Sequence, residues 1–291
     1  MDLQQMRLIR ALAETGSFSK AAEKCDISQP AMSIHIQNLE EELGMLLVDR
    51  LPRGAQLTEA GKTVLEYSRK ILSLVEEMKL TIGELSGLKR GRLTICASTT
   101  PGIYTLPDAL GRFKQEHPGI EVDLRIGNTQ HVEEAVSNRE IILGIIGQKP
   151  HNQELQWEHY LKDVLVAIVS PQHKLAKRKS ISVAELTKEP FIQREEGSNT
   201  RKTCEEAFQH HGVMMHVAME LGSTEAIKRA VAANLGVAIV SPYTLVWELK
   251  NRRLVALKLR ERGFEREFNL IYRRGRQLPP STAAFMKMLK T

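Results

Sequence analysis

The chain has 291 residues, enough for two or three compact units, and its composition of 42% hydrophobic and 26% charged residues is that of a globular protein. Three widely spaced cysteines and the lack of an apolar run of about 18 residues argue against a disulfide framework and a membrane helix, so we expect a soluble, cytoplasmic protein. The formal net charge of +6 is a weak indication of a nucleic-acid partner, because basic residues are outnumbered by acidic ones within 1–60 and the excess lies after residue 250.

Short helices and tight turns are predicted at the N-terminus. A first helix ends at Gly16, a second begins at Ser17 or Ser19, and a break at 26–27 leads into "ISQPAMSIHIQNLEEELG" at 27–44. Two short helices joined by a tight turn, the second with a polar outer face, form a helix-turn-helix. The second helix of that motif sits in the major groove of DNA.

The helix within 27–44 has two distinct faces. Ser28 can cap its start, Pro30 suits its first turn and Gly44 suits its end. The stripe expected to face a core comprises Met32, Ile36, Leu39 and Leu43. The opposite, mostly uncharged face comprises Gln29, Pro30, Ser33, Ile34 and Gln37. A solvated surface is the simpler interpretation for an isolated segment, whereas the neighbouring helix and wing favour contact with base edges.

A wing is predicted after this helix. The stretches 46–49 and 55–57 have strand character, and Pro52-Arg53-Gly54 forms the turn between them. We expect Arg50 and Arg53 to meet the DNA backbone or minor groove.

A long helix is predicted from Thr58 to about Leu85. It repeats apolar residues every seven positions at Val64, Ile71, Met78 and Leu85, with Tyr67, Leu74, Val75 and Ile82 between them. The helix reaches the basic, glycine-rich hinge "SGLKRGR" with no neighbouring body to pack on. We therefore expect a dimer; a helix packed on its own domain is the alternative.

Alternating strands and helices follow, which predicts an α/β fold with a largely parallel sheet. The expected strands include 92–98, 120–127 and 141–147, with helices at 105–119 and 132–140. The chain crosses into a second lobe near Lys162 and returns near Glu265. We divide the chain into a winged helix-turn-helix DNA-binding domain at 1–58, a dimerising linker helix and hinge at 59–90, and an effector-binding domain at 91–291, with lobe I at 91–162 and 266–291 and lobe II at 163–265.

Hydroxyl-bearing residues stand where strands give way to helices in both lobes, the position at which ligands of open α/β sheets gather. They occur in "ASTTPG" (Ser98, Thr99, Thr100), "GNTQ" (Thr129), "EGSNTR" (Ser198, Thr200, with Arg201) and "LGSTE" (Ser223, Thr224). Each alone is explained as a helix N-cap. Four groups converging from two lobes, with an arginine, favour a site for a small anion.

The N-terminal run "SFSKAAEKCDISQPAMSIHIQNLEEELG", followed by "RLPRGAQLTEAG", resembles the signature of the LysR-type transcriptional regulators, and the resemblance continues through the chain. It implies a winged helix-turn-helix on promoter DNA, a dimerising linker helix, dimers that pair into tetramers, and a two-lobed effector domain similar to periplasmic binding proteins. By position, Gln29, Pro30, Ser33 and Arg53 match family residues that meet DNA. Ile34 and His35 depart from the common arginine and glutamine, so we expect Ile34 to contact a thymine methyl or, as the alternative, the partner protomer.

"IGNTQHVEEAV", "QREEGSNTR" and "MELGSTEAIKRAVAANLGVAIVS" are similar to the subgroup that regulates sulfite reduction, cysteine synthesis or carbon fixation genes. The resemblance implies a small, anionic metabolite as effector. The residues carried over from the subgroup are Thr99, Thr100, Thr129, Ser198, Thr200, Arg201 and Thr224. Arg194 is interpreted as a surface arginine beside Glu195 and Glu196, with a cleft position as the alternative.

Other classes of function are less well supported by the sequence. No nucleophile elbow, P-loop, GxGxxG after a strand or HExxH is present, and the histidines and cysteines have no metal spacing. We expect no catalytic residues, cofactor or metal. A DNA-binding protein without effector control is the nearer alternative, and a two-lobed enzyme the more distant one. RNA polymerase is expected as a further partner at the promoter.

Overall fold

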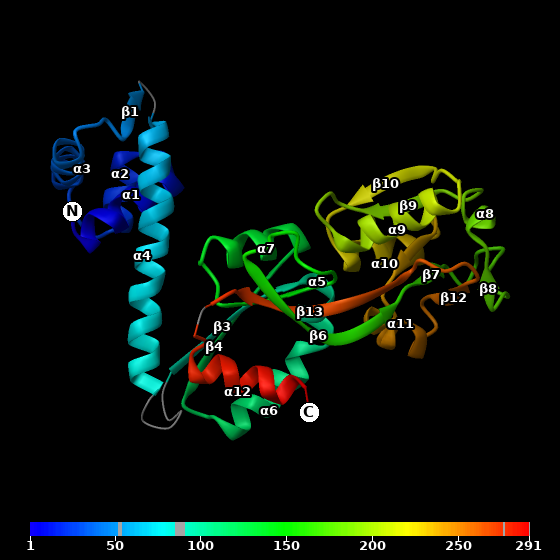
Figure 1. The fold of residues 1–291 in the computed structure, drawn as a ribbon. Helices are drawn as coiled ribbons and strands as arrows, with labels where there is room; N and C mark the ends of the chain where they lie inside the picture. Colours follow the sequence, from blue (N-terminus) through cyan, green and yellow to red (C-terminus); the bar gives the residue numbers. More distant parts are fainter. Residues whose placement is uncertain (52–53, 85–90, 276, 291) are drawn as a thin grey trace. The chain divides into compact units, whose positions relative to one another are not determined.

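The computed structural model describes residues 1–51, 54–84, 91–275 and 277–290. They form two compact units, the first built mainly from Met1–Gly83 and the second from Glu84–Ser137 and Ile141–Thr291. The first unit is a winged helix-turn-helix with a long helix, and the second is a two-lobed α/β domain (Figure 1).

Three short helices make the head of the first unit: α1 (Leu3–Thr15), α2 (Phe18–Lys24) and α3 (Gln29–Leu43). Ser28 Oγ accepts a hydrogen bond from the Ala31 N–H at the start of α3, and Gly44 ends the helix in the left-handed conformation. Met32 and Ile36 pack into a buried core shared by all three helices. Leu43, which we expected in this stripe, is 40% exposed because it lies in the last turn, beyond the shared core.

The wing is a two-stranded antiparallel sheet formed by β1 (Val48–Leu51) and β2 (Gly54–Leu57). Its strands are tied to the helices by hydrogen bonds. The Glu40 carboxylate on α3 accepts from the Leu47 and Val48 N–H groups at 2.7 and 3.1 Å. The Ala55 N–H donates to the Gly16 carbonyl at 2.8 Å. The position of the wing is therefore fixed relative to α1 and α3.

The long helix α4 (Glu59–Glu84) is capped by Thr58, whose hydroxyl accepts from the Gly61 N–H at 3.0 Å. Val64, the first residue of the predicted seam, packs against the core of the head. Leu85, the last, lies outside the described residues. Further along the helix, the large apolar side chains that are described as exposed within this unit are Tyr67, Leu74, Met78 and Ile82.

Lobe I is a five-stranded sheet in the order β4-β3-β5-β13-β6. The strands are β3 (Gly91–Ser98), β4 (Ile120–Gly127), β5 (Leu143–Ile146), β6 (Leu155–Val164) and β13 (Glu265–Arg273). The first three are parallel, whereas β13 runs antiparallel to both its neighbours, so the sheet is mixed and not largely parallel. α6 (Leu106–Glu116) and α12 (Pro280–Leu289) cover one face and α7 (Thr129–Ser137) the other (Figure 1).

Lobe II contains a four-stranded sheet in the order β11-β7-β12-β8 and a parallel pair, β9 and β10. Its strands are β7 (Val166–Val169), β8 (Ser180–Ile181), β9 (Phe191–Arg194), β10 (Val217–Leu221), β11 (Ala238–Val240) and β12 (Val255–Leu259). Its helices are α8 (Val183–Leu186), α9 (Asn199–His210), α10 (Thr224–Ala232), the 3₁₀ helix η1 (Pro242–Thr244) and α11 (Val246–Lys250). Phe191, Phe208 and Phe264 stack edge-to-face in its core.

Two strands connect the lobes, because β6 leads into lobe II and β13 returns from it (Figure 1). They pair along their whole lengths, from Val164 opposite Glu265 to Leu155 opposite Arg273. A buried ion pair joins them where they enter lobe II: Arg266 Nε lies 2.8 Å from Asp163 Oδ2, and the side chains are 6% and 0% exposed.

Two elements differ from the sequence prediction around the lobe junction. The segment after β3 is a short helix, α5 (Thr99–Tyr104), where we expected a loop. Pro101 is tolerated because it lies in the first turn, where its missing N–H would have had no helical partner. α7 begins at Thr129, three residues before the expected start, and ends at Ser137, which places Thr129 in a helical first turn.

Candidate functional site

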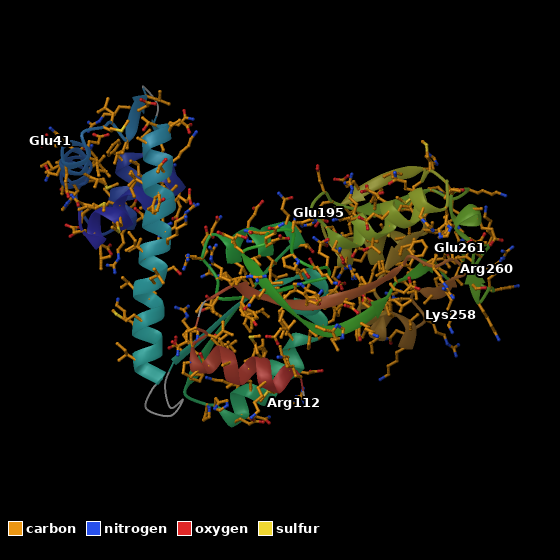
Figure 2. All side chains as sticks on the ribbon, in the orientation of Figure 1. Glu41, Arg112, Glu195, Lys258, Arg260 and Glu261 are labelled. Atoms are coloured by element: carbon orange, nitrogen blue, oxygen red, sulfur yellow. The ribbon has the colours of Figure 1, made fainter. Side chains whose placement is uncertain are left out.

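The outer face of α3 is free within its unit. Gln29, Pro30 and Gln37 are exposed, Ser33 is half-buried and Ile34 is 57% exposed. Gln29 Nε2 donates to Ser33 Oγ at 3.3 Å, and Gln37 Nε2 donates to Glu41 Oε1 at 3.0 Å, with Glu41 labelled in Figure 2. These side chains can exchange such weak exposed bonds for bonds to base edges.

Of the two arginines expected in the wing, only Arg50 lies within the described residues. Arg50 lies in β1 and is exposed, and its guanidinium carbon stands 4.9 Å from the centre of the Phe18 ring, a cation–π contact that orients the side chain. Arg53, expected at the wing tip, lies outside the described residues.

In the second unit, the lobes meet at a buried arginine. Arg194 ends β9, all of whose residues are buried, and is itself only 5% exposed. Its Nη1 donates to Thr224 Oγ1 at 2.9 Å and its Nη2 to Thr99 Oγ1 at 3.4 Å, so it joins a hydroxyl of lobe II to one of lobe I. The interpretation of Arg194 as a surface residue is wrong, because β9 runs beneath the lobe junction.

A second buried arginine lies on β13. Arg266 Nη1 donates to Thr200 Oγ1 at 2.8 Å, and its Nη2 is buried without a partner among the described atoms. Burial lowers the pKa of Arg266, Asp163 opposes this, and the positive charge of Arg194 lowers the pKa further. An anion between the lobes would offset the positive charge of both arginines.

Loops beside Arg194 bring the lobes into close contact. Asn128 Nδ2 in lobe I donates to the Glu196 carbonyl at 3.4 Å, and the Gln130 N–H donates to the Gly197 carbonyl at 3.4 Å. Gly197 has a φ of +80°, and a Cβ there would lie 2.8 Å from Asn128 Nδ2. Only glycine combines this backbone conformation with so close an approach.

The remaining predicted hydroxyls are mostly buried at helix starts. Ser98 and Ser198 hold the N-cap positions of α5 and α9, and neither side chain makes a capping bond within the described structure. Thr100 and Thr129 are buried in the first turns of α5 and α7. Ser223 does cap its helix, because its hydroxyl accepts from the Ala226 N–H at 3.1 Å. That bond gives Ser223 a structural role.

Arg201 directs its charge elsewhere. Its Nε lies 2.8 Å from Glu205 Oε1 on α9, and its Nη1 lies 2.8 Å from Glu220 Oε2 on β10. The hydrogen bond to Glu205 raises the pKa of Arg201. The structure therefore joins Thr99 and Thr224 to Arg194, whose cleft position was only the alternative interpretation of the sequence. It joins Thr200 to Arg266, which the sequence did not single out, and it gives Arg201 acidic partners of its own.

A separate groove of about 1130 Å³ also lies between the lobes. Tyr104 on α5 donates to Glu225 on α10, and the buried Lys228 Nζ lies 2.6 Å from Glu248 Oε1 and donates to the Thr244 carbonyl at 2.8 Å. Burial, with the bond to Glu225, raises the pKa of Tyr104 to about 12. The phenol is therefore neutral at physiological pH, and in this cluster one lysine, Lys228, pairs with two carboxylates, those of Glu225 and Glu248.

The chemistry of these residues is that of binding. Buried hydroxyls and arginines suit an oxyanion, for which a guanidinium offers a two-pronged match. Among the residues that the structure describes, no group of three or more His, Cys, Asp or Glu side chains could hold a metal ion. Within the same residues, no helix is long and apolar enough to span a membrane.

Comparison with known proteins covers nearly the whole chain. Residues 3–62 match the model of the bacterial regulatory helix-turn-helix protein, lysR family, and residues 86–291 match the LysR substrate binding domain. The HTH-type transcriptional activator CmpR of Synechocystis sp. is 39% identical over 99% of this chain and 94% of its own. The RuBisCO operon transcriptional regulator of Allochromatium vinosum is 37% identical over 99% of this chain and 95% of its own.

Two solved structures are informative. The regulatory domain of CcmR from Synechocystis PCC6803, in complex with 2-PG, is 36% identical with a TM-score of 0.65, over 69% of this chain and 96% of that one. Full-length CbnR in complex with its target DNA superposes over 100% of this chain and 99% of that one, with a TM-score of 0.74 and 22% identity, a likeness of fold.

Proposed function

The chain belongs to the LysR family of bacterial transcriptional regulators, and from that premise we propose that it regulates carbon fixation genes in response to a small phosphorylated acid held between its lobes. The observation that carries the effector site is Arg194, a buried cation that joins Thr99 of lobe I to Thr224 of lobe II. The related CcmR domain binds 2-PG, 2-phosphoglycolate, which carries a phosphate and a carboxylate. The two buried arginines, Arg194 and Arg266, could each pair with one of these two anionic groups.

The effector would act by changing the arrangement of the lobes. An anion that binds more tightly to one arrangement shifts the population toward it, and α4 would transmit this as a changed spacing of the two DNA-binding heads of a dimer. The bend of the promoter DNA then changes, and access of RNA polymerase follows. We place this activity in the cytoplasm.

The effector test compares two threonine-to-valine variants of the full-length protein. Thr224→Val removes the hydroxyl that Arg194 contacts. Thr187→Val is the matched control, because the Thr187 hydroxyl donates to the Ala184 carbonyl three residues earlier in its own segment. DNA affinity and bending are measured by gel shift, with and without 2-phosphoglycolate. We expect Thr224→Val to keep its DNA affinity and lose the response, and Thr187→Val to behave as the wild type.

The result also separates the alternatives. A wild-type protein that binds promoter DNA and responds to no anion would support a DNA-binding protein without effector control. Loss of DNA binding itself in Thr224→Val would contradict the assignment of Thr224 to the effector site. The relatives named above are transcriptional regulators, which leaves an enzyme as the least supported alternative.

We propose that the outer face of α3 reads base edges, with Ser33 and Gln37 as hydrogen-bonding residues and Ile34 against a thymine methyl. Binding followed by sequencing of retained genomic fragments tests this. Ser33→Ala should relax the choice of sequence, and an unchanged preference would remove Ser33 from the readout. Arg53→Ala should weaken all sites and flatten the salt dependence by about one unit, as expected for a phosphate contact.

We propose that the exposed apolar side chains of α4 form the dimer interface, because an unpaired stripe of this kind is costly in water. Leu74→Asp should convert the dimer to monomers in sedimentation analysis. Lys79→Asp, an exposed position on the same helix, is the control and should stay dimeric. A dimeric Leu74→Asp protein would contradict this interface. A tetramer, which the family resemblance implies, would be seen in the same experiment.

A further inference from the structure

Arg194 already holds a carboxylate. Its Nε donates to Glu195 Oε2 at 2.6 Å and its Nη2 donates to Glu195 Oε1 at 2.7 Å. Both prongs on one edge of the guanidinium are thus matched to both oxygens of one carboxylate, the geometry that an external carboxylate or phosphate would adopt on an arginine. The carboxylate belongs to the next residue in the chain, and its side chain is 25% exposed while that of Arg194 is 5% exposed.

We propose that Glu195 is an internal substitute for the anionic effector and sets the charge that an effector must carry. This inference rests on the proposed function of the interlobe residues as an anion site. A buried guanidinium needs a counter-charge when no ligand is bound. Glu195 supplies it from the adjacent position, and an arriving anion must displace it.

Competition with Glu195 discriminates between anions by charge. A monocarboxylate brings one negative charge and displaces one, so its electrostatic gain at Arg194 is small. A phosphorylated acid brings more negative charge than it displaces, and its second anionic group can be attracted by Arg266, whose buried Nη2 has no partner among the described atoms. The pair Arg194–Glu195 therefore selects multiply charged effectors over simple carboxylates of similar size.

Displacement of Glu195 from Arg194 would also change the contacts of lobe II with lobe I. Glu195 begins the segment 195–198, whose Glu196 and Gly197 carbonyls accept hydrogen bonds from lobe I. Figure 2 labels Glu195 at the junction of the two lobes. When its side chain leaves Arg194, the same segment must adjust, and its contacts with Asn128 and Gln130 change. Binding at Arg194 is in this way coupled to the contact between the lobes.

A permanent counter-ion is the opposing interpretation, and it predicts the opposite result. If Glu195 only neutralises and orients Arg194, its removal leaves a buried charge unpaired and a misplaced guanidinium, and anion binding weakens. If Glu195 is a competitor, its removal leaves the Arg194 guanidinium free to bind an external anion, and anion binding strengthens.

The test compares Glu195→Gln with Glu196→Gln in the full-length protein. The second variant removes the same charge one residue away, from an exposed side chain. Affinities for 2-phosphoglycolate, inorganic phosphate and glycolate are measured by titration calorimetry. We expect Glu195→Gln to bind 2-phosphoglycolate at least about tenfold more tightly than the wild type, the factor that one charge-assisted hydrogen bond represents. It should also gain binding of glycolate, while Glu196→Gln stays within about twofold of the wild type.

The outcomes separate this inference from the function on which it rests. Equal or weaker binding by Glu195→Gln, beside a wild type that binds, would overturn the role of Glu195 and leave the anion site intact. Absence of binding by both folded proteins would overturn the anion site itself, and the inference with it. If Glu195→Gln does not fold, Glu195→Asp keeps the charge but is too short for the two-pronged contact; tighter binding by that variant supports the inference, and unchanged or weaker binding contradicts it.

Discussion

Replacing Asp163 with asparagine should destabilise the two-lobed unit strongly. Asp163 is fully buried, and it neutralises Arg266 at 2.8 Å while accepting a hydrogen bond from Ser241 Oγ at 2.9 Å. Asparagine has nearly the same shape but no charge, so Arg266 would remain buried without a counter-charge. Removing one partner of such a pair costs about 3–5 kcal/mol. Because the pair joins the strands between the lobes, the loss should affect both lobes.

The free energy of unfolding is measured by urea titration of the full-length protein, with a signal that reports on the second unit. Asp123→Asn is the control, because Asp123 pairs with Arg92 and Arg125 where both arginines are largely exposed, and such pairs contribute about 0–1 kcal/mol. Adding Arg266→Met to Asp163→Asn should recover part of the lost stability, since the unpaired charge of Arg266 is then removed as well. A free energy of unfolding for Asp163→Asn within about 1 kcal/mol of the wild type would refute the reasoning.

Two further predictions concern packing and thiol chemistry. Gly61→Ala should destabilise the first unit by about 1–3 kcal/mol, because a Cβ there would lie 2.0 Å from the Leu47 carbonyl oxygen. Gly111→Ala is the control: a Cβ there would have nothing within 4 Å, so this substitution should be neutral or stabilising. Thermal unfolding of the two variants makes the comparison. Burial raises the pKa of the Cys204 thiol to about 12, so the thiol stays protonated through the physiological range. Alkylation at pH 8 should leave Cys204 unmodified in the folded protein and modify it in urea, and rapid modification without denaturant would contradict its burial.

The helices of the head could be predicted because their signals are local. Ser28, Pro30 and Gly44 act on the backbone within a few residues, and the structure has α3 where those residues place it. The strand β6 was missed although "LQWEHYLKDV" carries Trp157 and Tyr160 and alternates partly buried with exposed residues. The polar residues Gln156, Glu158, His159, Lys162 and Asp163 interrupt the apolar ones and concealed a strand whose two faces meet different surroundings.

The site could be predicted only in part, because its hydroxyls have local signals and its charges do not. Thr99 and Thr224 stand at helix starts, which a sequence can show. Arg194 is flanked by Glu195 and Glu196, a pattern typical of a surface, and is buried only because β9 passes beneath another lobe. The antiparallel direction of β13, which brings Arg266 to Asp163, is likewise decided by pairing partners more than a hundred residues away.

The pairing of Val164 with Glu265 means that lobe II begins and ends at neighbouring points of one ladder. In construction it is an insertion into lobe I whose two ends lie side by side, and insertions of this geometry disturb the host least. Such a lobe can be exchanged between relatives as one segment, cut at two residues that are paired across the β6–β13 ladder. The chain thus offers a route by which regulators with one DNA-binding head acquire new effectors without rebuilding the sheet that carries them.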